Sequence, residues 1–400
     1  MNDSLTLAGA NGMPLAPETR TILRLLENLQ DGMLELRLPD GAVASFGNGM
    51  PGVTLQVKDE AMFDRVLARG DIGFAEAYLD GQWDAPDLAG LLTLLAKNRD
   101  ELARAIYGNW RGLLAARLRH LFNRNSRAGS KRNIMAHYDL GNDFYRAWLD
   151  DTMSYSSALF SAADDTLEMA QAAKYRRILE RLEARPGERI LEIGCGWGGF
   201  AALAVREGLS VTGLTLSPAQ LAWAQCRVAS ADFRLQDYRD VRERYDHIVS
   251  IEMFEAVGER WWPTYFATVA RALQPGGQAL IQTITIRDDL FAAYRKGTDF
   301  IQQHIFPGGM LPSKGEFRRQ AERQGLAVRD EFAFGLDYAR TLALWREAFE
   351  ANWPRIAALG FDETFRRLWR FYLAYCEAGF RAGTIDVVQF ELGHRAQRPA

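Results

Sequence analysis

Four glycines lie within six residues of the stretch LEIGCGWGGFAALA, which covers residues 191–204 and begins with an apolar run. A glycine-rich loop after a strand lets the backbone approach a ligand closely. Dinucleotides, phosphates and sulfonium cofactors are all bound by loops of this kind. Gly194, Gly196 and Gly199 match the pattern G-x-G-x-x-G, which alone does not specify the ligand. The residues around the loop are therefore needed to distinguish between these ligands.

The polar residues near the loop disfavour a dinucleotide and a P-loop. A dinucleotide site needs an acid at the end of the second strand to bind the ribose hydroxyls, and the stretch VTGLTLSPAQ, residues 211–220, has none. No Lys-Ser or Lys-Thr pair follows the glycines, so the phosphate loop is disfavoured as well. Glu192 instead precedes the first glycine by two residues, which is typical of S-adenosylmethionine methyltransferases. We therefore predict an S-adenosylmethionine site.

The cofactor contacts predicted from these residues fall on two segments. The loop and its acid offer carboxylate and backbone partners to a cation with an amino-acid tail. The stretch LQDYRD, residues 235–240, is expected to hold the adenine. The residues expected to bind the cofactor on these grounds are Glu192, Gly194, Cys195, Gly196, Trp197, Gly198, Gln236, Asp237 and Tyr238.

The elements that must position these residues alternate between helix and strand from about residue 165. Apolar strands are expected at 189–194, 209–217, 231–239, 245–254 and 277–285, with helices between them, which predicts a parallel, doubly wound α/β sheet. A small α+β unit is expected before it, with a hairpin around Pro39-Asp40-Gly41. The predicted division is a disordered stretch 1–17, the small unit 18–128, and the α/β domain 129–400.

Composition bounds the class of protein. The chain has 400 residues, 48% apolar and 25% charged, with a net charge of −3, so no nucleic-acid partner is expected. Its three cysteines are scattered, which disfavours a zinc site and suits a cytoplasmic location; no metal is expected. Neither a signal peptide nor a membrane-spanning run is predicted.

A basic segment follows the small unit. Residues 111–132 hold seven Lys or Arg and no acid, and Leu114, Leu118 and Leu121 share one helical face. Two interpretations stay open: a solvated helix with a basic face, or a segment that docks on anionic lipid.

Several further motifs occur in order along the chain: HYDLGNDFYRAWLDDTMSYSSALF, GLTLSPAQ, IVSIEMFEAVG, IFPGGMLPS and GLDYARTLALW. With the glycine loop they resemble the cyclopropane-fatty-acyl-phospholipid synthase family over most of residues 130–385. The resemblance implies a class I, Rossmann-like methyltransferase domain with a helical lipid-binding insert and C-terminal helices. It also implies a peripheral enzyme on the inner face of an anionic membrane, acting on unsaturated phospholipid acyl chains, and it leaves a homodimer open.

The family transfers a methyl group to a cis double bond and closes a ring by proton loss from the cationic intermediate. The resemblance adds Tyr155, Ser156, Thr215, Leu216 and Gln220 to the cofactor contacts. It also implies a bound bicarbonate as the base. The residues that it assigns to this catalytic site are Ser157, Glu255, Gln282, Ile284 and Tyr338.

Two positions depart from the commonest family pattern, with Ser157 in place of Cys and Gln282 in place of His. Both can still donate hydrogen bonds to an anion. Three functions are therefore weighed: cyclopropane formation, methyl transfer that ends in a methyl-branched alkene, and lipid binding without catalysis. Ring formation is the expected outcome.

Overall fold

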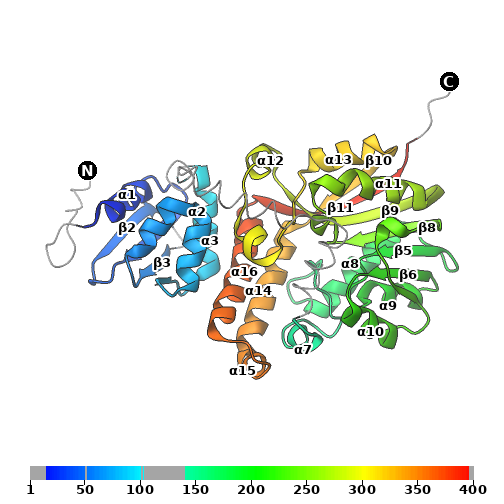
Figure 1. Cartoon of the computed structure of the whole chain (residues 1–400), viewed down its shortest axis with the longest axis horizontal. Helices are drawn as coiled ribbons and strands as arrows, with labels where there is room; N and C mark the ends of the chain where they lie inside the picture. The colour runs from blue at the N-terminus through cyan, green and yellow to red at the C-terminus, as the bar shows by residue number, and fades with distance from the viewer. Residues whose placement is uncertain (1–14, 50–51, 101, 103–139, 396–400) are drawn as a thin grey trace.

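The computed structural model describes residues 15–49, 52–100, 102 and 140–395. Two sheets with their helices lie at opposite ends of the molecule, and helices α14 and α16 lie between them (Figure 1). The basic segment 111–132 and the predicted boundary near residue 128 lie outside the described residues, as does most of the stretch expected to be disordered. None of the described helices is both long and apolar enough to cross a bilayer.

The N-terminal unit is a four-stranded sheet in the order β2-β1-β3-β4. Strands β1 and β2 pair antiparallel, which confirms the predicted hairpin, while β1 and β3 pair parallel. Alternate residues of β1 and β3, such as Leu34, Leu36 and Leu55, are buried under the helices. The elements of this unit are α1 (Pro17–Leu26), β1 (Gly32–Arg37), β2 (Val43–Asn48), β3 (Gly52–Val57), α2 (Ala61–Leu79), β4 (Trp83–Asp84) and α3 (Leu88–Lys97).

The second unit is a seven-stranded sheet in the order β10-β11-β9-β8-β5-β6-β7. Neighbouring strands from β7 to β9 pair parallel, as predicted. Strands β10 and β11 are antiparallel additions that the sequence analysis did not predict, so the sheet is mixed. The C-terminal helices expected over residues 340–382 are present as α14 to α16, and the last described element is β11, for which the sequence analysis predicted no strand.

The elements of the second unit are α7 (Asn142–Tyr145), α8 (Leu167–Arg181), β5 (Arg189–Ile193), α9 (Gly199–Arg206), β6 (Ser210–Thr215), α10 (Pro218–Arg227), β7 (Asp232–Leu235), β8 (Tyr245–Ile251), α11 (Trp262–Ala272), β9 (Leu273–Ile286), α12 (Asp288–Tyr294), α13 (Lys314–Arg323), β10 (Leu326–Ala333), α14 (Gly335–Ala351), α15 (Trp353–Ala357), α16 (Glu363–Arg381) and β11 (Ile385–His394).

Helices cover both faces of this sheet. Apolar residues of α8, α9 and α10 pack on one face, and those of α11 and α13 pack on the other. Local signals begin the helices: Ser217 caps α10 by accepting a hydrogen bond from the Gln220 amide, and Pro218 lies in the first turn.

The order of the strands reverses at β5. Successive strands run from β5 outward to β6 and β7, and the chain then returns to form β8 and β9 on the other side of β5. Ligands bind at the carboxyl ends of the strands beside such a reversal.

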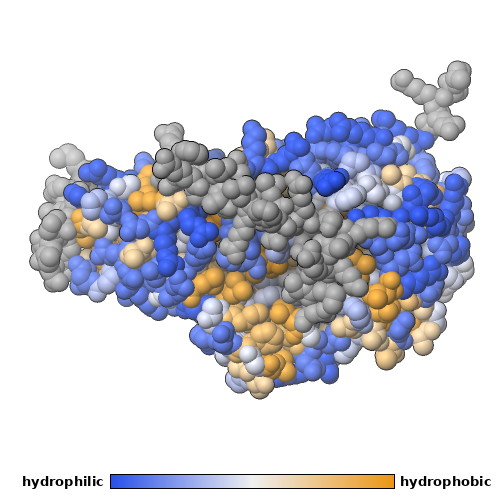
Figure 2. Space-filling model, in the orientation of Figure 1, coloured by the Kyte–Doolittle hydropathy of each residue, from blue (hydrophilic) through white to orange (hydrophobic). Residues whose placement is uncertain are grey.

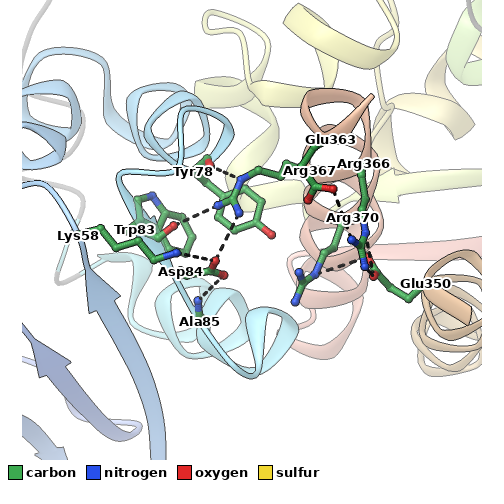
Figure 3. A network of polar contacts seen from close by, with 10 residues as sticks. All are labelled: Lys58, Tyr78, Trp83, Asp84, Ala85, Glu350, Glu363, Arg366, Arg367 and Arg370. Atoms are coloured by element: carbon green, nitrogen blue, oxygen red, sulfur yellow. Dashed lines mark hydrogen bonds and ion pairs between the residues drawn. The ribbon is translucent and has the colours of Figure 1, made fainter. Parts of the chain in front are cut away.

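Arg367 on α16 joins the two units (Figure 3). Its guanidinium donates to the carbonyl oxygens of Tyr78 and Trp83 at 2.8 and 3.2 Å, and to an Asp84 carboxylate oxygen at 3.3 Å. It also lies over the Tyr78 ring, 4.0 Å from its centroid. Around this contact, one apolar core runs from the N-terminal sheet into α14 and α16, so the two units share a core.

Candidate active site

The predicted cofactor residues line one pocket at the carboxyl ends of β5, β6 and β7. Every one of them contributes to its wall except Gly198. The lining includes Tyr155, Ser156, Glu192, Gly194, Cys195, Gly196, Trp197, Thr215, Leu216, Gln220, Gln236, Asp237 and Tyr238. Four separate segments of the chain therefore meet around one space, at the place where the strand order reverses.

The glycines of the loop differ in what surrounds them. Gly196 lines the pocket with φ +51°, and a Cβ added there would meet no atom within 4 Å. That open space is what a ligand in close contact with the backbone needs. Gly198 instead packs away from the pocket, where a Cβ would lie 3.2 Å from Phe233 and 3.3 Å from Ala224. The expectation that Gly198 contacts the cofactor is therefore not supported; its missing side chain lets the loop pack against β7 and α10.

Hydroxyl and amide groups take the place of an acid after β6. The Thr215 hydroxyl donates to the side-chain oxygen of Gln220 at 2.8 Å, and it accepts from the backbone amide of Ser217 at 3.1 Å. Such groups can bind ribose hydroxyls. After β7, Asp237 pairs with Arg239 at 2.6 Å. It also accepts from the Arg239 backbone amide, which ends the strand and starts a short 3₁₀ turn where continued strand was expected.

The buried charges of the pocket favour a cationic ligand. Glu192 is 3% exposed, and within the described chain its Oε2 has no hydrogen-bond partner. Burial raises the pKa of Glu192 to about 8, which Lys174 partly opposes. Burial also lowers the pKa of Lys174 to about 7. Its ammonium donates to Ser156 Oγ at 2.6 Å and to Gln171 Oε1 at 2.5 Å. An unpartnered carboxylate oxygen fits a sulfonium with an ammonium tail and would repel a pyrophosphate.

A second, larger cavity of about 680 Å³ opens from this pocket. The two share Tyr155, Glu252 and Ala256. The larger cavity has a predominantly apolar lining drawn from α1 to α3, α12, α14, α16 and the segment 297–311. Apart from two glutamates near the junction, its acids are Asp71 and Asp299, whose pKa values are raised by burial to about 7 and about 6. A long apolar chain could therefore reach the polar pocket from this side.

Glu252 lies at the junction and binds three of the groups that were expected to hold bicarbonate. Its Oε1 accepts from the Ser157 backbone amide at 2.8 Å and from Gln282 Nε2 at 2.7 Å. Its Oε2 accepts from the Tyr338 hydroxyl at 2.5 Å. The hydroxyl of Ser157 turns away and donates to the Ala158 carbonyl oxygen. These donors are already taken by a carboxylate of the chain, so the residues do not fit a free bicarbonate at this position.

Glu255 lies beside Glu252 and accepts from the backbone amide of Ile284 at 2.5 Å. Burial raises the pKa of Glu255 to about 8, and the neighbouring charge of Glu252 adds to the rise. Burial also raises the pKa of Glu252, against the opposing effects of Lys174 and the three donors. Two carboxyl groups this close do not both ionise at neutral pH, and the donors favour Glu252 as the charged member.

The five residues that the resemblance assigned to the catalytic site lie together around Glu252 and Glu255. Sequence analysis missed Glu252 and Lys174. The motif IEMFEAVG contains two acids three residues apart, and only the second was considered. Lys174 gave no signal, since a single lysine in an amphipathic helix normally faces solvent. Cys195, expected near the cofactor, is buried with its pKa raised well above the ordinary value, which excludes a thiolate role.

Known proteins resemble the chain over most of its length. A family model described as mycolic acid cyclopropane synthetase matches residues 125–390. The tuberculostearic acid methyltransferase UfaA1 of Mycobacterium tuberculosis is 39% identical over 396 residues, covering 95% of this chain and 92% of that protein. The cyclopropane-fatty-acyl-phospholipid synthase of Escherichia coli is 39% identical over 346 residues, covering 86% and 88%. The crystal structure of the mycolic acid cyclopropane synthase CmaA1 with SAH and CTAB has a TM-score of 0.62 and 37% identity, covering 66% and 97%.

Proposed function

The chain belongs to the mycolic acid cyclopropane synthetase family and is an S-adenosylmethionine-dependent methyltransferase, and on that premise we propose that it methylates the cis double bond of unsaturated phospholipid acyl chains. The observation that carries the proposal is the junction of the two cavities. A polar pocket suited to a cation meets an apolar cavity of about 680 Å³ at Tyr155, Glu252 and Ala256. A lipid-binding protein without catalysis would not need that junction.

The residues at the junction suit the proposed chemistry. S-adenosylmethionine supplies an electrophilic methyl group when it is bound. The apolar lining holds the double bond against that group and excludes water, which would otherwise trap a cation. Tyr155 lines both cavities, and its ring packs at 5.3 Å on Trp345 and at 5.5 Å on Trp148. Such a fixed aromatic face can stabilise a nearby cation.

The product depends on which proton the cation loses. Loss from the new methyl group closes a cyclopropane ring, the first candidate, in line with the resemblance to cyclopropane synthases. Loss from a chain carbon gives a methyl-branched alkene, the second candidate. The placement of Glu252 where a free anion was expected is the reason to weigh the second candidate. UfaA1, a relative of nearly full length, is named as a tuberculostearic acid methyltransferase and not as a cyclopropane synthase. Bicarbonate is left out of the proposal, because its expected donors bind Glu252.

Lipid mass spectrometry of cells that express the protein tests the function. Unsaturated phospholipid chains should gain the mass of one CH₂ group, and hydrogenation should separate a ring, which resists it, from a branched alkene. Gly196→Asp should abolish the product, while Gly325→Asp, also at a positive φ with open space around it, controls for backbone strain. Unchanged lipids with soluble, folded wild-type protein would refute the function.

We also propose that the enzyme works at the inner, anionic surface of a membrane. The basic segment 111–132 supports this, and so does a patch of apolar residues over the ends of α14 to α16 (Figure 2). Leu359, between α15 and α16, is 45% exposed. Binding to anionic vesicles should weaken as salt rises and on changing Arg117, Arg119 and Arg124 to Gln. Equal binding to neutral vesicles would contradict this proposal.

A further inference from the structure

We propose that the carboxylate of Glu252 is the proton acceptor that ends the reaction, so that the enzyme needs no bicarbonate. The inference rests on the proposed methyl transfer to a double bond. It is carried by position: Glu252 is the one acid that lines both cavities among the described residues. Its side chain fills the place where the donors Ser157, Gln282 and Tyr338 converge.

The hydrogen bonds leave one acceptor position open on this carboxylate. A carboxylate has about four lone-pair sites, two on each oxygen. Oε1 accepts from two donors, the Ser157 amide and Gln282 Nε2. Oε2 accepts from the Tyr338 hydroxyl alone among the described groups. The second lone pair of Oε2 is therefore the site at which a proton can be taken up.

The backbone conformation of Glu252 points to a functional role for its side chain. Its φ is +50°, in the left-handed region that favours glycine and that other residues occupy at a cost. The side chain is also held rigidly, since its three donors come from three different parts of the fold. A strained position whose carboxylate is held by three donors is typical of a functional group.

The neighbouring charges assign different protonation states to the two acids. Burial raises the pKa of Glu252, but the attraction of Lys174 and three hydrogen bonds oppose that rise and favour its ionised form over that of Glu255. Glu255 receives the Ile284 amide and has a pKa raised to about 8, which keeps it largely protonated at neutral pH. The pair thus presents one base and one neutral acid at the junction.

The proposed step balances in atoms and charge. The electron pair of the double bond forms a bond to the methyl carbon as the bond from that carbon to sulfur breaks, and the other alkene carbon becomes a cation. A C–H bond of the new methyl group, or of a chain carbon beside the cationic carbon, then breaks. Its electron pair closes the ring or forms a new double bond, while the proton goes to Glu252 Oε2. The protonated carboxyl group returns this proton to water when the product leaves.

Three variants and one added anion test the inference. Turnover on unsaturated phospholipid vesicles is measured in carbon-dioxide-depleted buffer, with and without sodium bicarbonate, and bicarbonate binding is measured by calorimetry. The wild type should turn over equally in both buffers and bind no bicarbonate. Glu252→Gln should lose about 10²–10⁴-fold in turnover, as expected for a lost general base, in both buffers. Glu316→Gln, a buried acid on α13 outside both cavities, should match the wild type.

Glu252→Gly is the decisive variant because glycine suits the positive φ and empties the anion position. It should keep the wild-type melting temperature, bind bicarbonate, and regain turnover when bicarbonate is added. The inference is overturned if the wild type binds or requires bicarbonate, if Glu252→Gln keeps wild-type turnover, or if bicarbonate neither binds nor rescues folded Glu252→Gly. A wild type that methylates no acyl chain would refute the proposed function instead, and the calorimetry, which needs no turnover, would still decide the anion question.

Discussion

Cofactor affinity should depend on pH through Glu192. The burial that raises its pKa to about 8 means that this carboxyl group is mostly protonated at neutral pH in the free protein. A cationic ligand in the pocket favours the ionised form and lowers that pKa. Binding below pH 8 therefore releases a proton, and affinity should rise with pH until the free carboxyl group is ionised.

The magnitude follows from the pKa values. Each pH unit below the free pKa weakens binding about tenfold, or 1.36 kcal/mol. From pH 8, where about half of the free groups are already protonated, down to pH 6, affinity should therefore fall roughly 50-fold for the carboxyl group alone. Lys174, with a pKa lowered to about 7, carries more positive charge at low pH and repels the ligand, so its contribution has the same sign. Glu192→Gln should remove the larger part of the dependence and leave that of Lys174.

Isothermal titration calorimetry of S-adenosylmethionine at several pH values between 6 and 9 measures this directly. Glu192→Gln should weaken binding strongly at pH 9 and little at pH 6, where the wild-type group is already neutral. S-adenosylhomocysteine, whose sulfur is uncharged, should show a shallower rise. Affinity that does not change with pH in the wild type, or a slope that Glu192→Gln leaves intact, would refute this electrostatic account.

Three further predictions follow from the geometry. Gly196→Asp should abolish S-adenosylmethionine binding in calorimetry, because its side chain would enter open pocket space at a positive φ. Arg367→Ala should lower the free energy of unfolding by about 2–3 kcal/mol in urea titrations, because its charged hydrogen bonds join the two units. Arg366→Ala, whose ion pairs stay within the C-terminal helices, should cost less; equal losses would contradict this. Glu255→Gln should lower kcat at pH 7 by less than about tenfold, since a group with a pKa of about 8 is already largely neutral; a loss as large as that of Glu252→Gln would contradict the assigned protonation states.

The residues that line the polar pocket could be predicted because they lie in short stretches of sequence. The acid, the glycines and the polar residues that follow three successive strands are short contiguous stretches, and parallel strands bring their carboxyl ends to one edge of the sheet. Gly198 does not line the pocket, and a sequence does not show which glycine of such a loop faces the pocket and which packs against α10. The turn at Asp237 was missed since a single side-chain cap, rather than the apolar pattern, ends that strand.

Long-range geometry could not be predicted in the same way. The donors to Glu252 lie 95, 30 and 86 residues away from it, so no local pattern reports that they converge on it rather than on Glu255. Strand β11 was missed because the helical periodicity of α16 ends only shortly before it. Its place between β9 and β10 is decided by pairing across the whole second unit.

The shared wall of the apolar cavity has a consequence for regiochemistry. The reacting end of the cavity is fixed by Glu252, whereas much of its remaining wall belongs to the N-terminal unit, at residues such as Leu34, Leu55 and Phe63. On the proposed function, the distance from that wall to the junction decides which carbon of the acyl chain meets the methyl group. The N-terminal unit then determines how far the acyl chain extends into the cavity. The position of the modified bond would therefore depend on a part of the protein that does not take part in the reaction.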